Sequence, residues 1–258
     1  MSGSPADASA PTESQVRRAS SSICSGSTFS NTDSLPQLPF KHYDRDAIRD
    51  NLQERVRFGR DFLRFSPDDG QTLNSVAKLI GPLVKPTVDA VYQQLFRFDY
   101  TARFFLKRNA GFEGDHAESL DRLTLDDPQI AFRKQILGGW VRKMFESDFE
   151  SPATWAYFDK VAAMHTGLAA FKHRANKDPL VVDLQPMALL LGWVVDVVVK
   201  AVMEMPDDVA DSTTKLAVIS AFNKLVWLQN DLFVRWYAKS DDELAAATAR
   251  TKAADASA

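Results

Sequence analysis

The sequence predicts an all-α protein, and three observations support this fold class. Apolar residues recur at helical spacing along most of the chain. Helix-start signals, in which Ser or Asp precedes Pro, stand at Ser66-Pro67, Asp127-Pro128 and Ser151-Pro152. No run of alternating β-branched residues between tight turns indicates a strand. About eight helices with short connections are therefore expected to pack around one core.

The first half of the folded region is predicted to hold three helices. The first spans residues 46–62, where apolar residues alternate with charged ones at helical spacing. The second begins at Ser66 and runs to Leu83, with acidic residues near its positive end. The third begins at Pro86. A short turn follows, and residues 107–126 are expected to form a polar loop with at most a short helix.

The second half is predicted to hold four helices, the first two of which begin at the second and third start signals. The next covers the most apolar stretch, residues 186–205, which contains Asp196 and Lys200. A charge near a bilayer centre costs roughly 3 kcal/mol, so this stretch indicates a buried helix of a soluble protein rather than a membrane span. The last helix is predicted over residues 209–239, a length of roughly 45 Å.

The two ends of the chain have a different composition from the region between them. Eleven serines fall within the first 34 residues, where few apolar residues could be buried. We therefore expect residues 1–39 to be a disordered tail. Residues 240–258 are Ala-rich and polar and are expected to be disordered or a frayed helix. The folded domain is predicted over residues 40–239.

Charge and cysteine content exclude several classes of protein. The net charge of −3, from 31 basic and 34 acidic residues, argues against a nucleic-acid-binding protein. The single cysteine, Cys24, excludes an internal disulfide and a four-cysteine zinc site. The N-terminus lacks the pattern of a secretory signal, so we expect a cytoplasmic protein with no membrane partner. Any metal or cofactor must be held by His, Asp, Glu or Met.

The four histidines are the main candidates for cofactor chemistry. No nucleophile elbow or His-Glu-x-x-His motif is present, and Glu113-x-x-His116 is the single Glu-x-x-His pair. His42 and His116 lie outside the predicted core helices. His173 lies beside Arg174 in a setting typical of an exposed histidine, and it is the less favoured alternative ligand. His165 differs, because it lies in an apolar stretch.

Small neighbours surround His165, namely Ala162, Ala163 and Gly167, and they leave space beside its imidazole. Such a histidine is either a satisfied core residue or the sole protein ligand of a haem iron in an apolar pocket. Tyr92 and Phe105, on other apolar faces, could line the opposite wall. Both interpretations stay open on these residues alone, and Tyr92 could equally be a core-packing residue.

A family resemblance adds to this pattern. Tyr92 stands in Val-Tyr-Gln-Gln-Leu-Phe and is followed 13 residues later by Phe105 in Arg-Phe-Phe. Trp140 closes Ile-Leu-Gly-Gly-Trp, His165 follows after 25 residues, and Asp-Leu-Gln-Pro-Met-Ala-Leu-Leu-Leu-Gly-Trp ends at Trp193. This order and spacing over residues 45–237 resembles the globin-coupled sensors, and in particular the protoglobins.

The resemblance implies a globin fold with an extra N-terminal helix, here residues 46–62, and haem b as cofactor. His165 corresponds to the proximal ligand of the iron and Tyr92 to the distal tyrosine that hydrogen-bonds to dioxygen. Phe105 corresponds to the aromatic residue at the haem edge. The remaining implied pocket residues are Leu137 and Val91, where protoglobins often have Phe and Trp, and Trp193 on the penultimate helix.

Three functions are compatible with this resemblance. The first is a five-coordinate haem protein that binds dioxygen, CO or NO for sensing, storage or scavenging, with an unknown signalling partner. The second is a haem-free globin module for dimerisation in signalling. The third is catalysis at the iron, as a nitric oxide dioxygenase with a reductase partner or as a peroxidase.

We also expect a homodimer through the last two helices. The apolar stripe over residues 187–202 is wider than one core face needs. In the last helix, Val226, Phe233 and Trp236 recur at a spacing suited to a partner helix.

Overall fold

The computed structural model describes residues 40–109, 111–171, 179–239, 246 and 249. The tail predicted over residues 1–39 and most of the segment predicted over 240–258 lie outside the described residues. The chain divides into two units, Met1–His42 and Tyr43–Ala258, and the fold described below is that of the second. In the described part its only β-type pairing is an isolated bridge between Thr166 and Val181, so the all-α prediction is confirmed.

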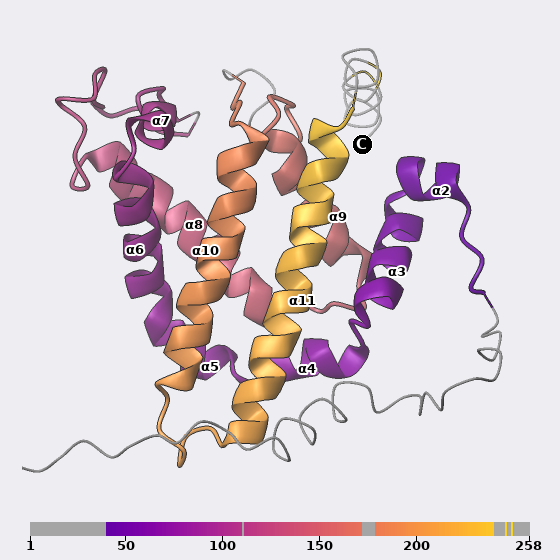
Figure 1. The fold of residues 1–258 in the computed structure, drawn as a ribbon. Coiled ribbons are helices and arrows are strands. Elements are labelled where there is room, and N and C mark those ends of the chain that lie inside the picture. Colours follow the sequence, from indigo (N-terminus) through magenta and orange to yellow (C-terminus); the bar gives the residue numbers. More distant parts are fainter. Residues whose placement is uncertain (1–39, 110, 172–178, 240–245, 247–248, 250–258) are drawn as a thin grey trace, which may run out of the picture. The chain divides into compact units, whose positions relative to one another are not determined.

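Helices account for the framework of this unit (Figure 1). In chain order they are α2 (Arg45–Asp50), α3 (Leu52–Leu63), α4 (Pro67–Ser75), α5 (Ala77–Ile80), η1 (Gly81–Leu83), α6 (Val84–Phe96), α7 (Asp99–Ala102), η2 (Arg103–Phe105), α8 (Pro128–Glu146), α9 (Pro152–Met164), α10 (Leu184–Met203) and α11 (Ser212–Tyr237).

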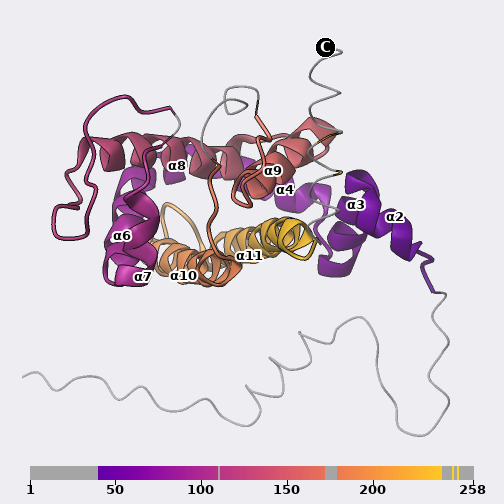
Figure 2. The same ribbon diagram turned by 90° about the horizontal axis from the view of Figure 1, so that it is seen from above.

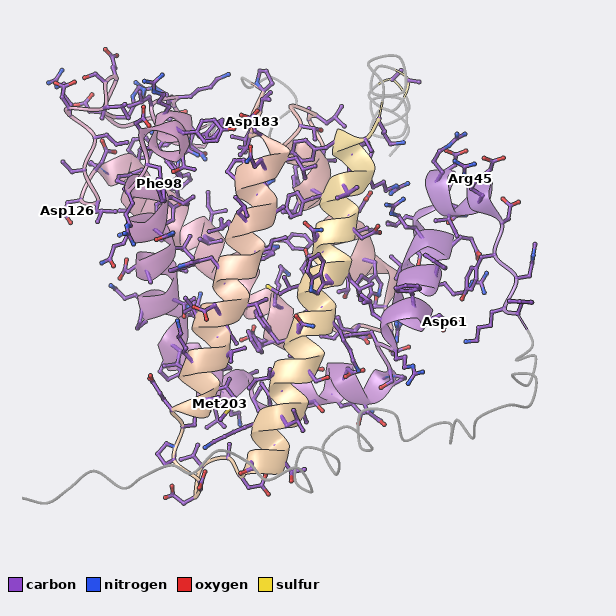
Figure 3. All side chains as sticks on the ribbon, viewed as in Figure 1. Arg45, Asp61, Phe98, Asp126, Asp183 and Met203 are labelled. Carbon is purple, nitrogen blue, oxygen red and sulfur yellow. The ribbon has the colours of Figure 1, made fainter. Side chains whose placement is uncertain are left out.

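The long helices form two layers (Figure 2). One layer holds α8 and α9 and the other holds α10 and α11, with α6 beside one end of the layers and α3 beside the other. Figure 3 labels Asp183 just before α10 and Met203 at its end, and shows that α10 and α11 run side by side in opposite directions. Side chains from both layers fill the space between them with one apolar core.

The helix predicted over residues 46–62 is two helices. Asn51 has an extended backbone, with φ −105° and ψ 120°, and it separates α2 from α3. Its side-chain oxygen accepts hydrogen bonds from the backbone N–H groups of Gln53 and Glu54, and so caps α3. Because Asn favours such caps over helix interiors, the apolar spacing alone could not show this break.

The helices predicted from Ser66 to Leu83 and from Pro86 also have different boundaries in the structure. Ser66 caps α4 in a capping box with Asp69, as its sequence signal predicts. The helix then ends at Ser75 and is followed by α5 and η1. α6 begins at Val84, two residues before the predicted start, because Pro86 is tolerated in the first turn of a helix, whose N–H groups need no partner within it.

The later elements follow their predicted signals closely. Asp127 caps α8 and Ser151 caps α9 through side-chain hydrogen bonds. Between η2 and α8 the described residues contain turns and bends but no helix, as predicted for the loop over 107–126. α11 begins at Ser212 rather than near residue 209, because Asp211 caps it by accepting a hydrogen bond from the Thr214 N–H.

α10 is apolar on both its faces. Of the helices that the structure describes, it alone is long and apolar enough to cross a membrane, a test that core helices of soluble proteins also pass. Its inner face contributes Leu191, Val194 and Val202 to the core. Its outer face exposes Leu189 and Met203, so the predicted burial holds for one face only.

Two residues predicted to face a partner helix are buried within the subunit. Val226 and Phe233 are each 3% exposed and belong to the core, so their assignment to a dimer contact is wrong. Trp236 is half-buried, and its indole N–H donates to Asp159 of α9 over 2.8 Å. The large apolar residues that α10 and α11 do expose are Leu189, Met203, Leu216 and Trp227.

Candidate haem-binding site

His165 stands at the C-terminal cap of α9, where the helix ends in two steps. The residue itself keeps a helical backbone, with φ −75° and ψ −11°. Gly167 then adopts φ +90°, a left-handed conformation that glycine reaches without strain. A Cβ at Gly167 would also lie 3.1 Å from a methyl group of Val181. The sequence Met-His-Thr-Gly therefore ends the helix directly after the histidine.

The imidazole of His165 is held in a defined orientation. Its Nδ1 lies 2.7 Å from the carbonyl oxygen of Val161, one turn earlier in α9. A carbonyl oxygen can only accept a hydrogen bond, so Nδ1 carries the proton and Nε2 carries the lone pair that a metal needs. The ring of Phe233 from α11 packs edge-on against the imidazole at 5.5 Å. Metal-ligating histidines usually donate their other ring N–H to a carbonyl or carboxylate oxygen in the way that Nδ1 does here.

The backbone of His165 and the segment at Val182 are hydrogen-bonded to each other and to α11. The carbonyl of His165 accepts a hydrogen bond from the Val182 N–H over 2.9 Å, beside the Thr166–Val181 bridge. The hydroxyl of Tyr237, at the end of α11, donates to the Val182 carbonyl over 2.5 Å and lies 3.4 Å from that of His165. The predicted ligand is thus fixed through both its side chain and its backbone.

Tyr92 lies on α6 in apolar surroundings and is 5% exposed. Its ring is 5.4 Å from Phe105 and 6.4 Å from Phe96, with the Lys134 ammonium 5.8 Å from its centre. No hydrogen bond joins its hydroxyl to another described residue. Burial raises the pKa of Tyr92 well above the usual value near 10, although the nearby positive charge of Arg133 lowers it. The phenol therefore stays protonated and can donate a hydrogen bond.

Two of the predicted pocket residues meet in the structure. Tyr92 and Phe105 are in direct contact, and Val91 is buried next to Tyr92 on α6. Leu137 on α8 and Trp193 on α10 are half-buried and pack against the apolar core. His165 contacts Phe233, which is a member of this core.

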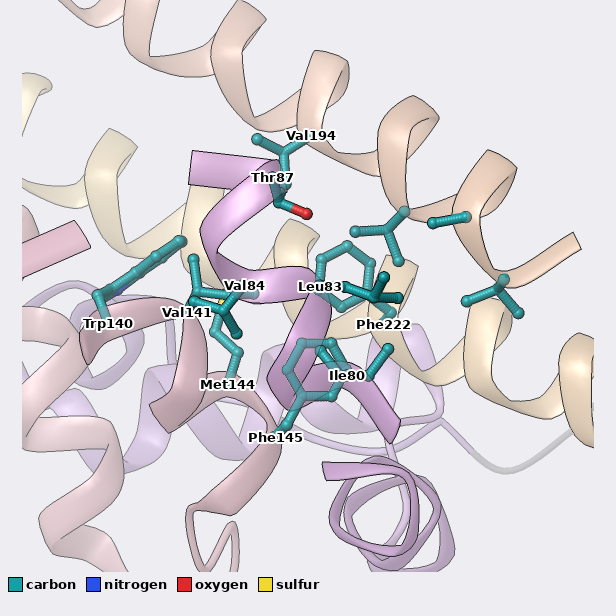
Figure 4. A pocket seen from close by; sticks show the side chains of 13 residues that line it. Ile80, Leu83, Val84, Thr87, Trp140, Val141, Met144, Phe145, Val194 and Phe222 are labelled. Carbon is teal, nitrogen blue, oxygen red and sulfur yellow. The ribbon is translucent and has the colours of Figure 1, made fainter. Parts of the chain in front are cut away.

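Trp140 has a feature that its sequence context did not show. Its indole Nε1 is buried and has no hydrogen-bond partner among the described residues. Trp140 lines a small apolar cavity of about 30 Å³ between α6, α8 and α10, which it borders together with Thr87 and Val194 (Figure 4). A buried donor without a protein partner is usually satisfied by water or by a ligand.

These residues fit a haem better than a metal ion held by several side chains. The described part of the chain contains no group of three or more His, Cys, Asp or Glu that could hold a metal. A haem iron needs a single neutral imidazole in an apolar setting. His165 offers the required tautomer, and Ala162 and Ala163 beside it are small and buried. Tyr92 is 5% exposed, and no described residue accepts a hydrogen bond from its hydroxyl.

The comparison with protein families decides the identity of the fold. The protoglobin family model matches residues 52–243, which is well over half of the chain. The chain belongs to the protoglobin family. Membership implies a haem-binding, globin-like domain that binds a gas. In this protoglobin the match begins at Leu52, the first residue of α3. Searches among curated proteins and among solved structures gave no significant match.

Two residues of the candidate site were missed by sequence reasoning. Phe233 and Tyr237 reach His165 from α11, across 68 and 72 positions of sequence respectively. Phe233 was assigned to a dimer contact, and Tyr237 was given no role. Helical spacing places both on α11 but cannot show which helix their faces meet. His173, the alternative ligand, lies outside the described residues.

Proposed function

We propose that this protoglobin binds haem b through His165 and holds a diatomic gas on the side of Tyr92. The observation that carries this proposal is the hydrogen bond from His165 Nδ1 to the Val161 carbonyl, which makes Nε2 of the neutral imidazole the nitrogen that would bind the iron. Ferrous haem supplies an iron atom that binds dioxygen, CO or NO. Phe105, Val91, Leu137 and Trp193 supply the apolar walls of the pocket.

Tyr92 gives the site a preference for dioxygen. A neutral phenol can donate a hydrogen bond to a gas that carries partial negative charge when bound, so the Tyr92 hydroxyl would stabilise dioxygen there. The high pKa of Tyr92 keeps this proton in place at physiological pH. Leu137 and Val91 are smaller than the Phe and Trp that the family often has, so we propose a roomier pocket around the gas.

Haem titration of the purified protein tests the ligand. Wild-type protein is expected to give a Soret band that saturates at one haem per chain. His165→Ala is expected to lose stoichiometric binding and to recover it when imidazole is added. His116→Ala, which changes a half-buried histidine of the polar loop, serves as the matched control and should bind like wild type.

Two outcomes contradict this assignment. If His165→Ala keeps a normal five-coordinate ferrous spectrum while His173→Ala loses it, His173 is the ligand. If the wild-type protein binds no haem, the alternative of a haem-free dimerisation module replaces the proposal.

The biological use that we propose is sensing, storage or scavenging of the gas in the cytoplasm. A sensor of this kind needs a signalling partner, and a nitric oxide dioxygenase would need a reductase. A gas-binding role is favoured over catalysis because the described residues around Tyr92 are aromatic and aliphatic, apart from Lys134 and Arg133.

We further propose a homodimer through the outer faces of α10 and α11. Leu189, Met203 and Leu216 are between 59% and 69% exposed there, and Trp227 is 54% exposed. Exposed apolar residues gathered on adjacent helices are typical of protein interfaces. Light scattering should report twice 28.8 kDa for wild type and a monomer for Leu216→Asp. Phe98→Asp, on an exposed apolar residue of another region, should stay dimeric. A monomeric wild type at micromolar concentration would contradict the proposal.

A further inference from the structure

The last turn of α11 contacts the proximal histidine and its helix through four side chains. Phe233 packs on the imidazole of His165, and Tyr237 reaches the backbone that follows it. Between them, Arg235 and Trp236 both donate to one carboxylate oxygen of Asp159, each over 2.8 Å. Asp159 lies on α9 six residues before the histidine. α9 is therefore held on α11 at two levels, beside the histidine and below it.

Tyr237 is linked to His165 through the backbone of Val182. A phenol carries one proton, and the 2.5 Å separation shows that it is given to the Val182 carbonyl rather than to that of His165 at 3.4 Å. Val182 in turn donates its N–H to the His165 carbonyl over 2.9 Å. Tyr237 is thus hydrogen-bonded to Val182, and Val182 is hydrogen-bonded to the backbone of His165.

A further hydrogen bond, next to Val182 in the chain, restrains the same segment. Asp183, the next residue, accepts a hydrogen bond from the Tyr100 hydroxyl over 2.5 Å. The segment around Val182 is consequently fixed from α7 as well as from α11.

We propose that Tyr237 is a positioning residue for the proximal histidine, acting through the Val182–His165 backbone pair. The inference rests on the proposed function, because it assigns His165 as the haem ligand. Loss of the hydroxyl would free the Val182 carbonyl and loosen the hydrogen bond that fixes the His165 backbone. The iron–histidine bond would then be less constrained. Tyr237 is the last residue of α11. A movement of His165 is therefore also expected to shift the C-terminal end of α11.

Tyr237→Phe tests this proposal, with Tyr157→Phe as the matched control. Tyr157 is a half-buried tyrosine on α9 whose hydroxyl makes no hydrogen bond to a described residue. The first readout is exchange of the Val182 amide hydrogen in haem-free protein. It is expected to accelerate roughly two- to tenfold in Tyr237→Phe, the effect of one ordinary hydrogen bond, and to stay unchanged in Tyr157→Phe.

The second readout is the iron–histidine stretching band in the resonance Raman spectrum of the full-length ferrous protein. We expect a shifted or broadened band in Tyr237→Phe and a wild-type band in Tyr157→Phe. A purely structural hydroxyl would change amide exchange or unfolding and leave this band in place, and that result overturns the inference while haem binding by wild type stands. A wild-type protein without haem removes the proposed function and this inference together.

Discussion

His165 at the end of α9 and Tyr92 on α6 differ in how their polar groups are satisfied. Nδ1 and the carbonyl of His165 are engaged by Val161 and Val182, and Tyr237 stands behind them. Tyr92 is surrounded by Phe105 and Phe96, and no described residue accepts its proton. The surroundings of His165 are built from hydrogen bonds, and those of Tyr92 from aromatic packing around a hydroxyl that no described residue accepts from.

This difference matches the two tasks that we assign to the halves. A metal ligand must keep one tautomer and one orientation, which directed hydrogen bonds provide. A hydroxyl that donates to an exchangeable gas must keep its position, and its proton must not already be donated to a protein acceptor. Apolar packing meets both requirements. We therefore expect changes to the proximal half to alter protein stability and haem retention, and changes to the distal half to alter gas binding.

The largest effect on stability is expected on the proximal side, at Asp159. This carboxylate and the Arg235 guanidinium are 11% and 9% exposed, and Trp236 shares the same oxygen. Asp159→Ala leaves a buried charge unpaired, which should lower the free energy of unfolding by about 3–5 kcal/mol. Urea unfolding measures this change.

Asp196→Ala is the matched control for this measurement. Its carboxylate forms an exposed pair with Lys200 one turn away on α10, and loss of such a pair should cost about 0.3–0.5 kcal/mol. Equal losses in the two variants would show that the contact between α9 and α11 does not stabilise the proximal half.

On the distal side, Tyr92→Phe should change gas release and leave the iron site intact. A hydrogen bond to a partly charged acceptor contributes roughly 1.5–3 kcal/mol, and each 1.4 kcal/mol is about tenfold. Dioxygen should therefore leave about ten- to a hundredfold faster. Carbon monoxide carries less charge when bound and should change much less. Stopped-flow measurement of both off-rates separates the two roles, because equal changes for both gases indicate a core-packing tyrosine.

The smallest expected effect concerns pH. Burial raises the folded-state pKa of Tyr237 to about 12, above the ordinary value near 10. The folded state then holds this proton more tightly than the unfolded state, so the stabilisation is complete below pH 10 and is lost as the pH rises toward 12. Wild-type protein without haem should lose stability over this window more steeply than Tyr237→Phe does.

Tyr92→Phe extends the pH comparison to the distal half. The pKa of Tyr92 is raised by burial in the same direction, so this variant should also flatten the loss of stability above pH 10. Urea unfolding at pH 8 and at pH 10.5 gives the slopes. Slopes identical to that of wild type in both variants would contradict the burial of these two phenols.

Sequence patterns predicted the parts of this fold that depend on neighbouring residues. The caps at Ser66, Asp127 and Ser151 lie where the Ser-Pro and Asp-Pro signals predict them, because a cap is a contact within three residues. The same locality explains one error. Apolar spacing continued through Asn51, whose side chain turned out to cap α3 and divide the predicted helix.

Contacts between distant helices could not be predicted in this way. The spacing of Val226, Phe233 and Trp236 showed that they share one side of α11, but not that this side faces α9 and the core. The role of Tyr237 depends on Val182, 55 positions earlier in the chain. The residue pattern and the family resemblance supplied His165 and Tyr92 as candidates, whereas the hydrogen bonds that distinguish their surroundings came from the structure.

The rate of haem dissociation tests the central comparison most directly. Transfer of haem to excess apomyoglobin can be followed for wild type, His165→Ala and Tyr92→Phe under one set of conditions. Changes that merely reorient a metal ligand already weaken binding about 10–100-fold, so loss of His165 itself should speed release about a hundredfold or more. Tyr92→Phe should stay within about threefold of wild type, a difference of roughly 0.6 kcal/mol. Comparable acceleration in both variants, or a larger one in Tyr92→Phe, would contradict the division of the site into a half that holds the haem and a half that holds the gas.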